Sequence, residues 1–263
     1  MDKINTIIKK EWAEVFKNRM VLFSIIFMPL LFAVIPLVML GVFNQSSSAS
    51  ELTSEMPTQY MSTCPEGLSG GDCFQIYMVN QFTLLFMMLP LIIPINIAAY
   101  SIVGEKTTHS LEPLLATPIT TSELLIGKTL AAAIPAILAT LSGFLIYAIG
   151  TLILVDNPLI IRALLDPMWL LAVLLVGPLL AILSVNFALL VSSRVNDPRV
   201  AEQVSAVLIV PLLAVFFGQI SGLFLINNRL ILLTALVLVA IDIAVVQMGV
   251  RLFQRETILT RWK

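Results

Sequence analysis

The sequence predicts an all-α polytopic membrane protein whose residues 1–263 form a single transmembrane domain. Hydrophobic residues make up 59% of the chain and charged residues only 12%, about half the charged share of a typical soluble domain. Long apolar runs recur along the chain, each long enough for the roughly 20 helical residues that cross a bilayer. We expect helices rather than barrel strands, because the runs do not alternate between apolar and polar residues.

Each membrane span is assigned from the length of its apolar run. Prolines lie inside five of the six runs and predict local kinks, because proline removes a backbone hydrogen bond from a helix. The predicted spans are residues 20–43, 77–103, 129–155, 168–193, 203–226 and 230–250.

Basic residues concentrate on one side of the predicted membrane. When the connections alternate between sides, 13 of the 15 Lys and Arg residues share a side with both termini, and only Arg162 and Arg229 lie opposite. Positively charged connections favour the cytoplasm. Both termini are therefore predicted to be cytoplasmic. The 44–76 loop, which has four acidic residues and no basic one, is predicted to be external.

Residues 2–18 are predicted to form an amphipathic helix on the inner leaflet. Apolar residues recur at helical spacing, from Ile4 through Ile7 to Trp12. Basic residues such as Lys9 and Lys10 are assigned to other faces, and an interfacial tryptophan suits a helix that lies on a membrane. A solvated N-terminal segment is the alternative.

Two cysteines, Cys64 and Cys73, share the predicted external loop. They could form a disulfide in an oxidising compartment, and the glycines between them would let the chain double back. Two free thiols remain the alternative, because one sequence cannot show pairing.

Polar residues inside the predicted spans are candidates for a transport pathway. A carboxylate near the middle of a span costs about 2.5–3.5 kcal/mol to insert, so Asp242 belongs either to a cation or proton pathway or to the structural interior. No set of side chains suggests a metal site or a catalytic centre, and the chain has one histidine. The pathway candidates are Asn96, Asn186, Gln219 and Asp242.

The connection between the second and third spans, residues 105–126, has start and stop signals for a short helix. Ser110 can cap a helix that begins at Leu111, and Pro118 ends it. Thr120 and Glu123 then form a capping box for the helix that enters the third span. The sequence therefore predicts a short transverse helix on the cytoplasmic side.

The end of this connection, Ser122–Thr129, superficially matches a phosphate-binding loop because it finishes in Gly127-Lys128-Thr129. A phosphate-binding loop needs an earlier glycine, where this chain has Ser122, and a preceding strand. Neither is predicted. We therefore expect no ATP hydrolysis by this chain and no cofactor bound to it.

The connection resembles the characteristic region of type-2 ABC exporter permeases, including their sodium-efflux and multidrug branch. The pattern is Glu-Lys, a Leu-Glu-x-Leu-Leu core, Thr-Pro, then Glu-Leu and Gly-Lys. The six spans, cytoplasmic termini and N-terminal helix extend the resemblance to the whole chain. The matching residues are Glu105, Lys106, Leu111, Glu112, Leu114, Leu115, Thr117, Pro118, Glu123, Gly127 and Lys128.

The resemblance implies that the short helix is a coupling helix, which docks into a groove of a separate ABC ATPase. ATP and Mg would bind that partner, in two copies, and a second permease would complete a homodimer or heterodimer in the cell membrane, surrounded by lipid and without nucleic acid. Leu111, Leu114 and Leu115 would be the anchors. The ATPase-coupling residues implied are Glu105, Lys106, Ser110, Leu111, Glu112, Leu114, Leu115, Thr117 and Pro118.

The predicted cargo is an amphipathic or hydrophobic compound such as a drug, peptide or lipid, because the spans are almost wholly apolar. Sodium extrusion is an alternative that Asp242 keeps open. A membrane scaffold or sensor that binds an ATPase without transporting anything is another.

Overall fold

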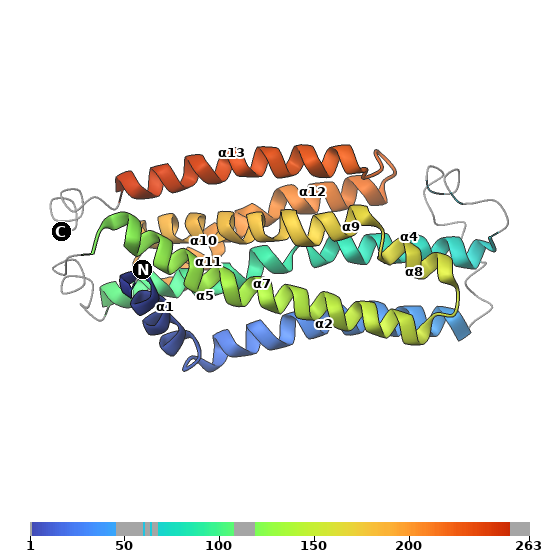
Figure 1. Cartoon of the computed structure of the whole chain (residues 1–263), viewed down its shortest axis with the longest axis horizontal. Helices are drawn as coiled ribbons and strands as arrows, with labels where there is room; N and C mark the ends of the chain where they lie inside the picture. Colours follow the sequence, from blue (N-terminus) through green and yellow to red (C-terminus); the bar gives the residue numbers. More distant parts are fainter. Residues whose placement is uncertain (1, 46–59, 61–63, 65–67, 108–118, 253–263) are drawn as a thin grey trace.

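The structure, a computed structural model, describes residues 2–45, 60, 64, 68–107 and 119–252. Across these residues the ordered elements are helices and no strand occurs. Six helical segments in this part of the chain are long and apolar enough to cross a membrane, which confirms the predicted all-α membrane fold. They run side by side in an elongated bundle (Figure 1).

A shorter helix, α1 (Asp2–Val15), precedes the membrane-length segments. Several of these segments consist of consecutive helical pieces, joined by short turns or by a change of helix type. Three segments are single helices: α2 (Arg19–Gln45), α7 (Thr121–Leu154) and α13 (Asn228–Leu252). The second segment consists of α4 (Gly70–Phe86) and α5 (Leu89–Thr107), and the fourth of α8 (Pro158–Leu164), α9 (Pro167–Leu171), the π-helix η3 (Ala172–Val176) and α10 (Gly177–Arg194). The fifth consists of α11 (Pro198–Ser205), the 3-10 helix η4 (Ala206–Leu208) and α12 (Ile209–Ile220).

The two ends of the bundle differ, and we name them for their contents. At the α1 end, α1 packs against the start of α7, close to the last turn of α5 (Figure 1). At the opposite, disulfide end lie α8, the start of α4 and the end of α12 (Figure 1). The positive charges predict that the α1 end faces the cytoplasm.

Hydrogen-bonded caps set two boundaries of the spans. The capping box predicted at Thr120 and Glu123 is confirmed, and α7 continues from it without a break into the third span. At the other end of the bundle, α4 begins at Gly70 rather than near residue 77, because the Ser69 side chain accepts a hydrogen bond from the Asp72 N–H. Part of the predicted 44–76 loop is therefore helix.

Prolines coincide with interruptions in three of the spans. A turn at Met87 and Met88 separates α4 from α5 just before Pro90. The π-helix η3 directly precedes the turn that holds Pro178, and the 3-10 helix η4 precedes Pro211. Such irregular turns accommodate the backbone hydrogen bond that each proline removes. By contrast, α2 and α7 remain continuous through their prolines.

The core lies between α5, α7 and α10 and is filled by large buried side chains. Phe86 stacks on Tyr147 with ring centroids 5.4 Å apart, and both rings are fully buried. Helix α2 approaches α7 closely at Gly143, where an added Cβ would lie 2.8 Å from the Cβ of Pro29. This tight packing holds α2, α4 and α7 together along the bundle.

Candidate functional site at the ends of the 105–126 segment

A buried ion pair closes the 105–126 segment: Glu105 is its first residue, and Lys128 lies two residues beyond its end. Glu105 lies near the end of α5, and Lys128 lies in the second turn of α7. The Lys128 Nζ is 3.0 Å from the Glu105 Oε2, and the two residues are only 4% and 3% exposed. Glu105 and Lys128 thus meet where the segment leaves and re-enters the bundle, and their contact holds α5 and α7 together there.

Helix α1 completes this site with two further charges. The Lys128 Nζ also lies 2.8 Å from the Glu11 Oε1, and Lys10 forms an ion pair with Glu105. Ser101 bridges the charges, because its hydroxyl accepts from Lys128 at 2.6 Å and donates to Glu11 at 2.9 Å. We call Lys10, Glu11, Glu105 and Lys128 the four-charge cluster; it contains two charges of each sign and joins α1, α5 and α7.

The α1 members of the cluster are ionised near neutral pH. Burial acts to raise the pKa of Glu11, but the charge and hydrogen bond of Lys128, helped by Lys10 and Ser101, outweigh it and lower that pKa. Burial likewise acts to lower the pKa of Lys10, but the hydrogen bond and charge of Glu105 outweigh it and raise that pKa. Each shift therefore reflects stabilisation of the charged form by its partner.

Apolar and hydrogen-bonding contacts hold α1 against α7 beside the cluster. The Trp12 indole donates a hydrogen bond of 3.0 Å to the Ala131 carbonyl. Gly127 provides the room for Ile7, since a Cβ added at Gly127 would lie 2.8 Å from the Ile7 Cγ2. The predicted N-terminal helix is present, and part of its apolar face packs on protein.

Lys10 was predicted to lie on a face of α1 other than the apolar one, and Glu11 was not singled out. In the structure the partly exposed Lys10 side chain forms an ion pair with Glu105 at the end of α5. Glu11 is 5% exposed and shares one face of α1 with the buried Ile7 and Val15. Its four-residue spacing from those two apolar residues is the signal that could have placed it on the packed face.

The Gly127-Lys128-Thr129 sequence lies inside α7, where each residue serves a contact between helices. Besides Gly127 and Lys128, the Thr129 hydroxyl donates to the Asn186 Oδ1 at 3.1 Å and so links α7 to α10. A regular helix offers its N–H groups to its own carbonyls and cannot cradle phosphate. This position agrees with the rejection of a phosphate-binding loop.

Helix α10 is joined to α5 next to the cluster. The Ser192 hydroxyl donates to the Ala99 carbonyl at 3.0 Å and accepts from the Val103 N–H at 3.2 Å, two residues before Glu105. The cluster is thus connected through α5 to the centre of the bundle.

Most of the predicted coupling residues lie outside the described residues. Glu105 is placed as given above. Lys106 lies in α5, but only its backbone is described. The remaining predicted coupling residues fall in the 108–118 gap, and they are Ser110, Leu111, Glu112, Leu114, Leu115, Thr117 and Pro118.

No hydrogen bond within the described residues joins any two of the four predicted pathway residues. Asn186 contacts Thr129, and the Gln219 amide donates to the Tyr60 hydroxyl near the disulfide end. Asn96 is half-buried on α5. Asp242 is buried on α13, and its carboxylate oxygens have no hydrogen-bond partner in the described part of the chain.

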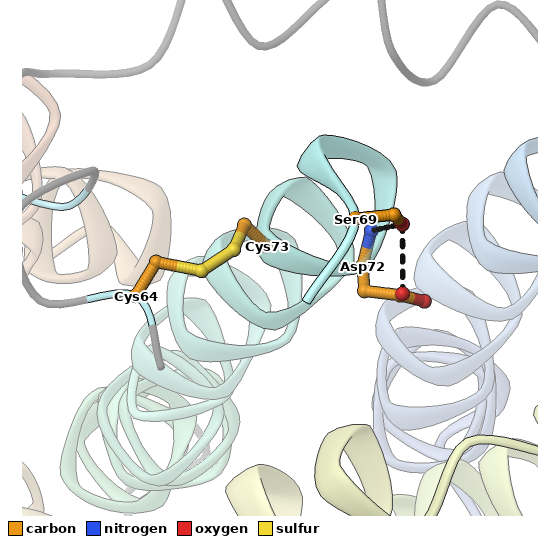
Figure 2. Close-up of a disulfide and its surroundings, with 4 residues drawn as sticks. All are labelled: Cys64, Ser69, Asp72 and Cys73. Atoms are coloured by element: carbon orange, nitrogen blue, oxygen red, sulfur yellow. Dashed lines mark hydrogen bonds between the residues drawn. A yellow bond between two sulfur atoms is a disulfide. The ribbon is translucent and has the colours of Figure 1, made fainter. Parts of the chain in front are cut away.

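At the disulfide end, the structure links Cys64 to Cys73, with Cα atoms 6.1 Å apart. Figure 2 shows the bond reaching the first turn of α4, beside the Ser69 hydroxyl that donates to the Asp72 carboxylate at 2.7 Å. Burial and the nearby Tyr77 raise the pKa of Tyr60 to about 12 against the opposing hydrogen bond from Gln219, so this phenol is neutral.

The comparison with protein families decides the class of the molecule. Residues 5–231, which include most of α1, the four-charge cluster and five of the six spans, match the family model described as ABC-2 family transporter protein. The chain belongs to the ABC-2 transporter family. It is a multi-pass membrane protein and a transport component, and membership of this family implies association with an ABC ATPase subunit. Among curated proteins, none matches the chain.

Proposed function

We propose that this ABC-2 permease is the membrane subunit of an exporter that moves an amphipathic or hydrophobic compound out of the cytoplasm. A separate ABC ATPase, which holds ATP and Mg, drives the movement from the predicted cytoplasmic face of the plasma membrane. The observation that carries the proposal is the buried Glu105–Lys128 pair at the base of the 105–126 segment.

The pair explains how a push on the segment would reach the spans. Separating Glu105 from Lys128 would leave two buried charges without their partner. Loss of one partner from a buried ion pair costs about 3–5 kcal/mol. A force on the segment therefore moves α5, α7 and α1 together more readily than it pulls them apart. Movement of packed helices as one body is a common form of conformational change.

We further propose that two permease copies and two ATPase subunits form the complete exporter. The outward faces of α2, α12 and α13 are rich in exposed apolar side chains such as Phe23, Phe217 and Leu236. Lipid and a second permease, whether identical or related, are the surroundings that suit such faces.

The experiment that tests this function reconstitutes the permease in vesicles with an ABC ATPase that co-purifies with it. Leu115→Asp, in the predicted anchor, should abolish co-purification of the ATPase, whereas Leu115→Met should preserve it. Glu105→Gln should leave co-purification intact but reduce transport per ATP hydrolysed at least fivefold, because the segment is no longer tied by charge to Lys128. Normal coupling in both Leu115→Asp and Glu105→Gln would refute the proposal.

A sodium exporter is the second candidate, and the unpartnered carboxylate of Asp242 is the observation that favours it. One carboxylate makes a poor cation site, because hard cations take several oxygen ligands, and the described residues contain no cluster of three potential metal-binding side chains. We predict that Asp242→Asn leaves transport of an apolar dye intact. Loss of ATP-driven sodium efflux in a folded, ATPase-bound Asp242→Asn permease would instead favour sodium.

The scaffold alternative differs in its ATPase kinetics. An exporter should show ATPase activity that rises with its cargo and should accumulate that cargo in inverted vesicles. Stable ATPase binding without either response would identify a scaffold or sensor.

A further inference from the structure

An apolar cavity of about 320 Å³ lies within the bundle, between α5, α10, α12 and α13. Its walls include Leu91, Val176, Leu183, Leu212 and Leu238. Thr234 also lines it, but the Thr234 hydroxyl donates to the Leu230 carbonyl of its own helix. Apolar cavities offer water no partners, and one of about 150 Å³ suffices to bind benzene. This cavity therefore suits an alkyl chain.

A second chamber of about 170 Å³ lies toward the disulfide end. Much of its wall is apolar, but we call it the polar chamber because several of its side chains can form hydrogen bonds. Tyr60, Tyr77, Asn80 and Gln219 line it together with the Cys64–Cys73 bond, and the described residues of its wall carry no charge. Gln219 is 2% exposed, and its Oε1 has no hydrogen-bond partner in the described residues. A buried, unpaired amide oxygen is costly, and a ligand that donates a hydrogen bond would relieve that cost.

The cavity and the chamber share part of their walls. Trp169 and Ile226 line both spaces. The Trp169 ring is 1% exposed, and its indole donates a hydrogen bond of 2.8 Å to the Asn80 side chain in the polar chamber. The apolar body of Trp169 thus borders the cavity, while its polar edge belongs to the chamber.

We propose that the two spaces form one site for a single-chain amphiphile with an uncharged, hydroxyl-bearing head. The tail occupies the apolar cavity, the head occupies the polar chamber, and Trp169 lies at the junction. This inference rests on the proposed export of amphipathic cargo and names a cargo class and its site within one subunit. The apolar volume is at the lower end of the range for small-molecule pockets, which fits one chain rather than two.

The head decides the selectivity of this site. A lipid bilayer is as apolar as the cavity, so the tail alone gains little by leaving the membrane. The chamber supplies the difference, because its tyrosines, Asn80 and Gln219 can hydrogen-bond a hydroxyl group. A charged head is disfavoured, because none of the described side chains that line the chamber carries a compensating charge.

The test measures how strongly a brominated alkyl chain quenches the fluorescence of Trp169. The protein has three tryptophans, so Trp12→Phe and Trp262→Phe leave Trp169 as the only one. The full chain is placed in nanodiscs and titrated with 12-bromododecanoyl glycerol, with 12-bromododecanoate as the charged comparison. A phosphatidylcholine with two brominated chains is the bulk-lipid comparison. We expect saturable quenching by the glycerol ester at a concentration at least tenfold below that of either comparison.

Two matched variants locate the site. Leu238→Phe fills the cavity and should raise the half-saturating concentration of the glycerol ester at least tenfold. Leu236 lies on the same helix but is 74% exposed, so Leu236→Phe should change that concentration by less than twofold. Gln219→Leu should weaken binding of the glycerol ester at least fivefold. It should leave binding of 1-bromododecane, which has no polar head, unchanged. If the single-tryptophan variant does not fold, the same comparisons use the shift of melting temperature that each probe gives the otherwise unmodified chain.

Equal quenching by the glycerol ester and the two-chain lipid, or an unchanged titration in Leu238→Phe, would overturn the site. Because the permease is tested without ATPase, that failure leaves the proposed coupling function standing. Failure of the Leu115→Asp and Glu105→Gln tests would in turn leave the binding measurement intact.

Discussion

Replacing Lys128 by methionine tests whether the four-charge cluster fastens α1 to the bundle. Lys128 is 4% exposed, and its ammonium lies 2.8 Å from Glu11 and 3.0 Å from Glu105. Methionine keeps most of the length of the side chain and removes the charge. The two buried carboxylates would then face each other, and among the described side chains only Lys10 would remain paired with them.

Two independent estimates give the size of the effect. Loss of one partner from a buried ion pair costs about 3–5 kcal/mol. Repulsion between two like charges about 5 Å apart amounts to about 3 kcal/mol at an effective dielectric constant of 20. We therefore expect Lys128→Met to lower the free energy of unfolding by about 3 kcal/mol or more, mainly by weakening the attachment of α1 to α5 and α7.

The measurement is a denaturant titration in detergent micelles, followed by circular dichroism and by Trp12 fluorescence. Lys9→Met is the control, because Lys9 is exposed on the same helix and should change the free energy of unfolding by less than about 0.5 kcal/mol. Adding Glu11→Gln to Lys128→Met removes one negative charge with the positive one. The pair Lys10–Glu105 then remains balanced, so the double variant should recover about 2 kcal/mol.

A free energy of unfolding for Lys128→Met that matches Lys9→Met would refute this reasoning. Strict additivity of the Glu11→Gln and Lys128→Met effects would do the same, because residues in one ion-pair network should be coupled.

Two further predictions concern how α1 is attached. The pKa of Glu11 is lowered from 4.5, so its contribution to stability should be complete above about pH 4.5 and lost as the pH falls through its folded pKa. The pKa of Lys10 is raised from 10.5, so its contribution to stability should be complete below about pH 10.5 and lost as the pH rises through its folded pKa. Fluorescence of Trp12, with the other tryptophans changed to phenylalanine, should be flat between these limits, and Glu11→Gln should remove the acid transition; an acid transition that persists unchanged in Glu11→Gln would contradict the assignment. Gly127→Ala should destabilise the attachment by about 1–3 kcal/mol, because its Cβ would lie 2.8 Å from the Ile7 Cγ2. Gly104→Ala is the control, because a Cβ added there would meet no described atom within 4 Å. In an Ile7→Ala background Gly127→Ala should cost less, because the side chain that it would clash with is gone. Equal effects of Gly127→Ala and Gly104→Ala in unfolding titrations would argue against close packing of α1.

The number and type of the elements were predictable because they follow from local properties. Long apolar runs require helices in a membrane, and the Thr120–Glu123 capping box lies within four consecutive residues, so it could be recognised without a partner helix. The break between α4 and α5 and the start of α4 at Gly70 were less accessible, because apolar hydropathy continues through the break and a single serine sets the start. Boundaries of this kind depend on one hydrogen bond rather than on a pattern.

The candidate site was predictable only in part, because its charges come from three helices. Glu105 and Lys128 stood out in the sequence through the family resemblance, whereas nothing local distinguished Lys10 from the other charged residues of the first helix. For Glu11 the local signal was its four-residue spacing from Ile7 and Val15, which does not name its partner. The partners of Lys10 and Glu11 lie 95 and 117 positions away along the chain. Likewise, the cavity and the chamber together are lined by residues from eight separate helical pieces, which no periodicity in the sequence connects.

By itself, the sequence determined that this is a six-span helical membrane protein with a capped, proline-bounded connection between its second and third spans, because hydropathy, charge and capping act within a few turns of the chain. The tertiary structure decided which charges are buried together, that Gly127, Lys128 and Thr129 serve contacts between helices, and where an apolar cavity meets a polar chamber. Those features depend on how closely helices from distant parts of the chain approach one another, and side-chain packing in three dimensions sets that distance.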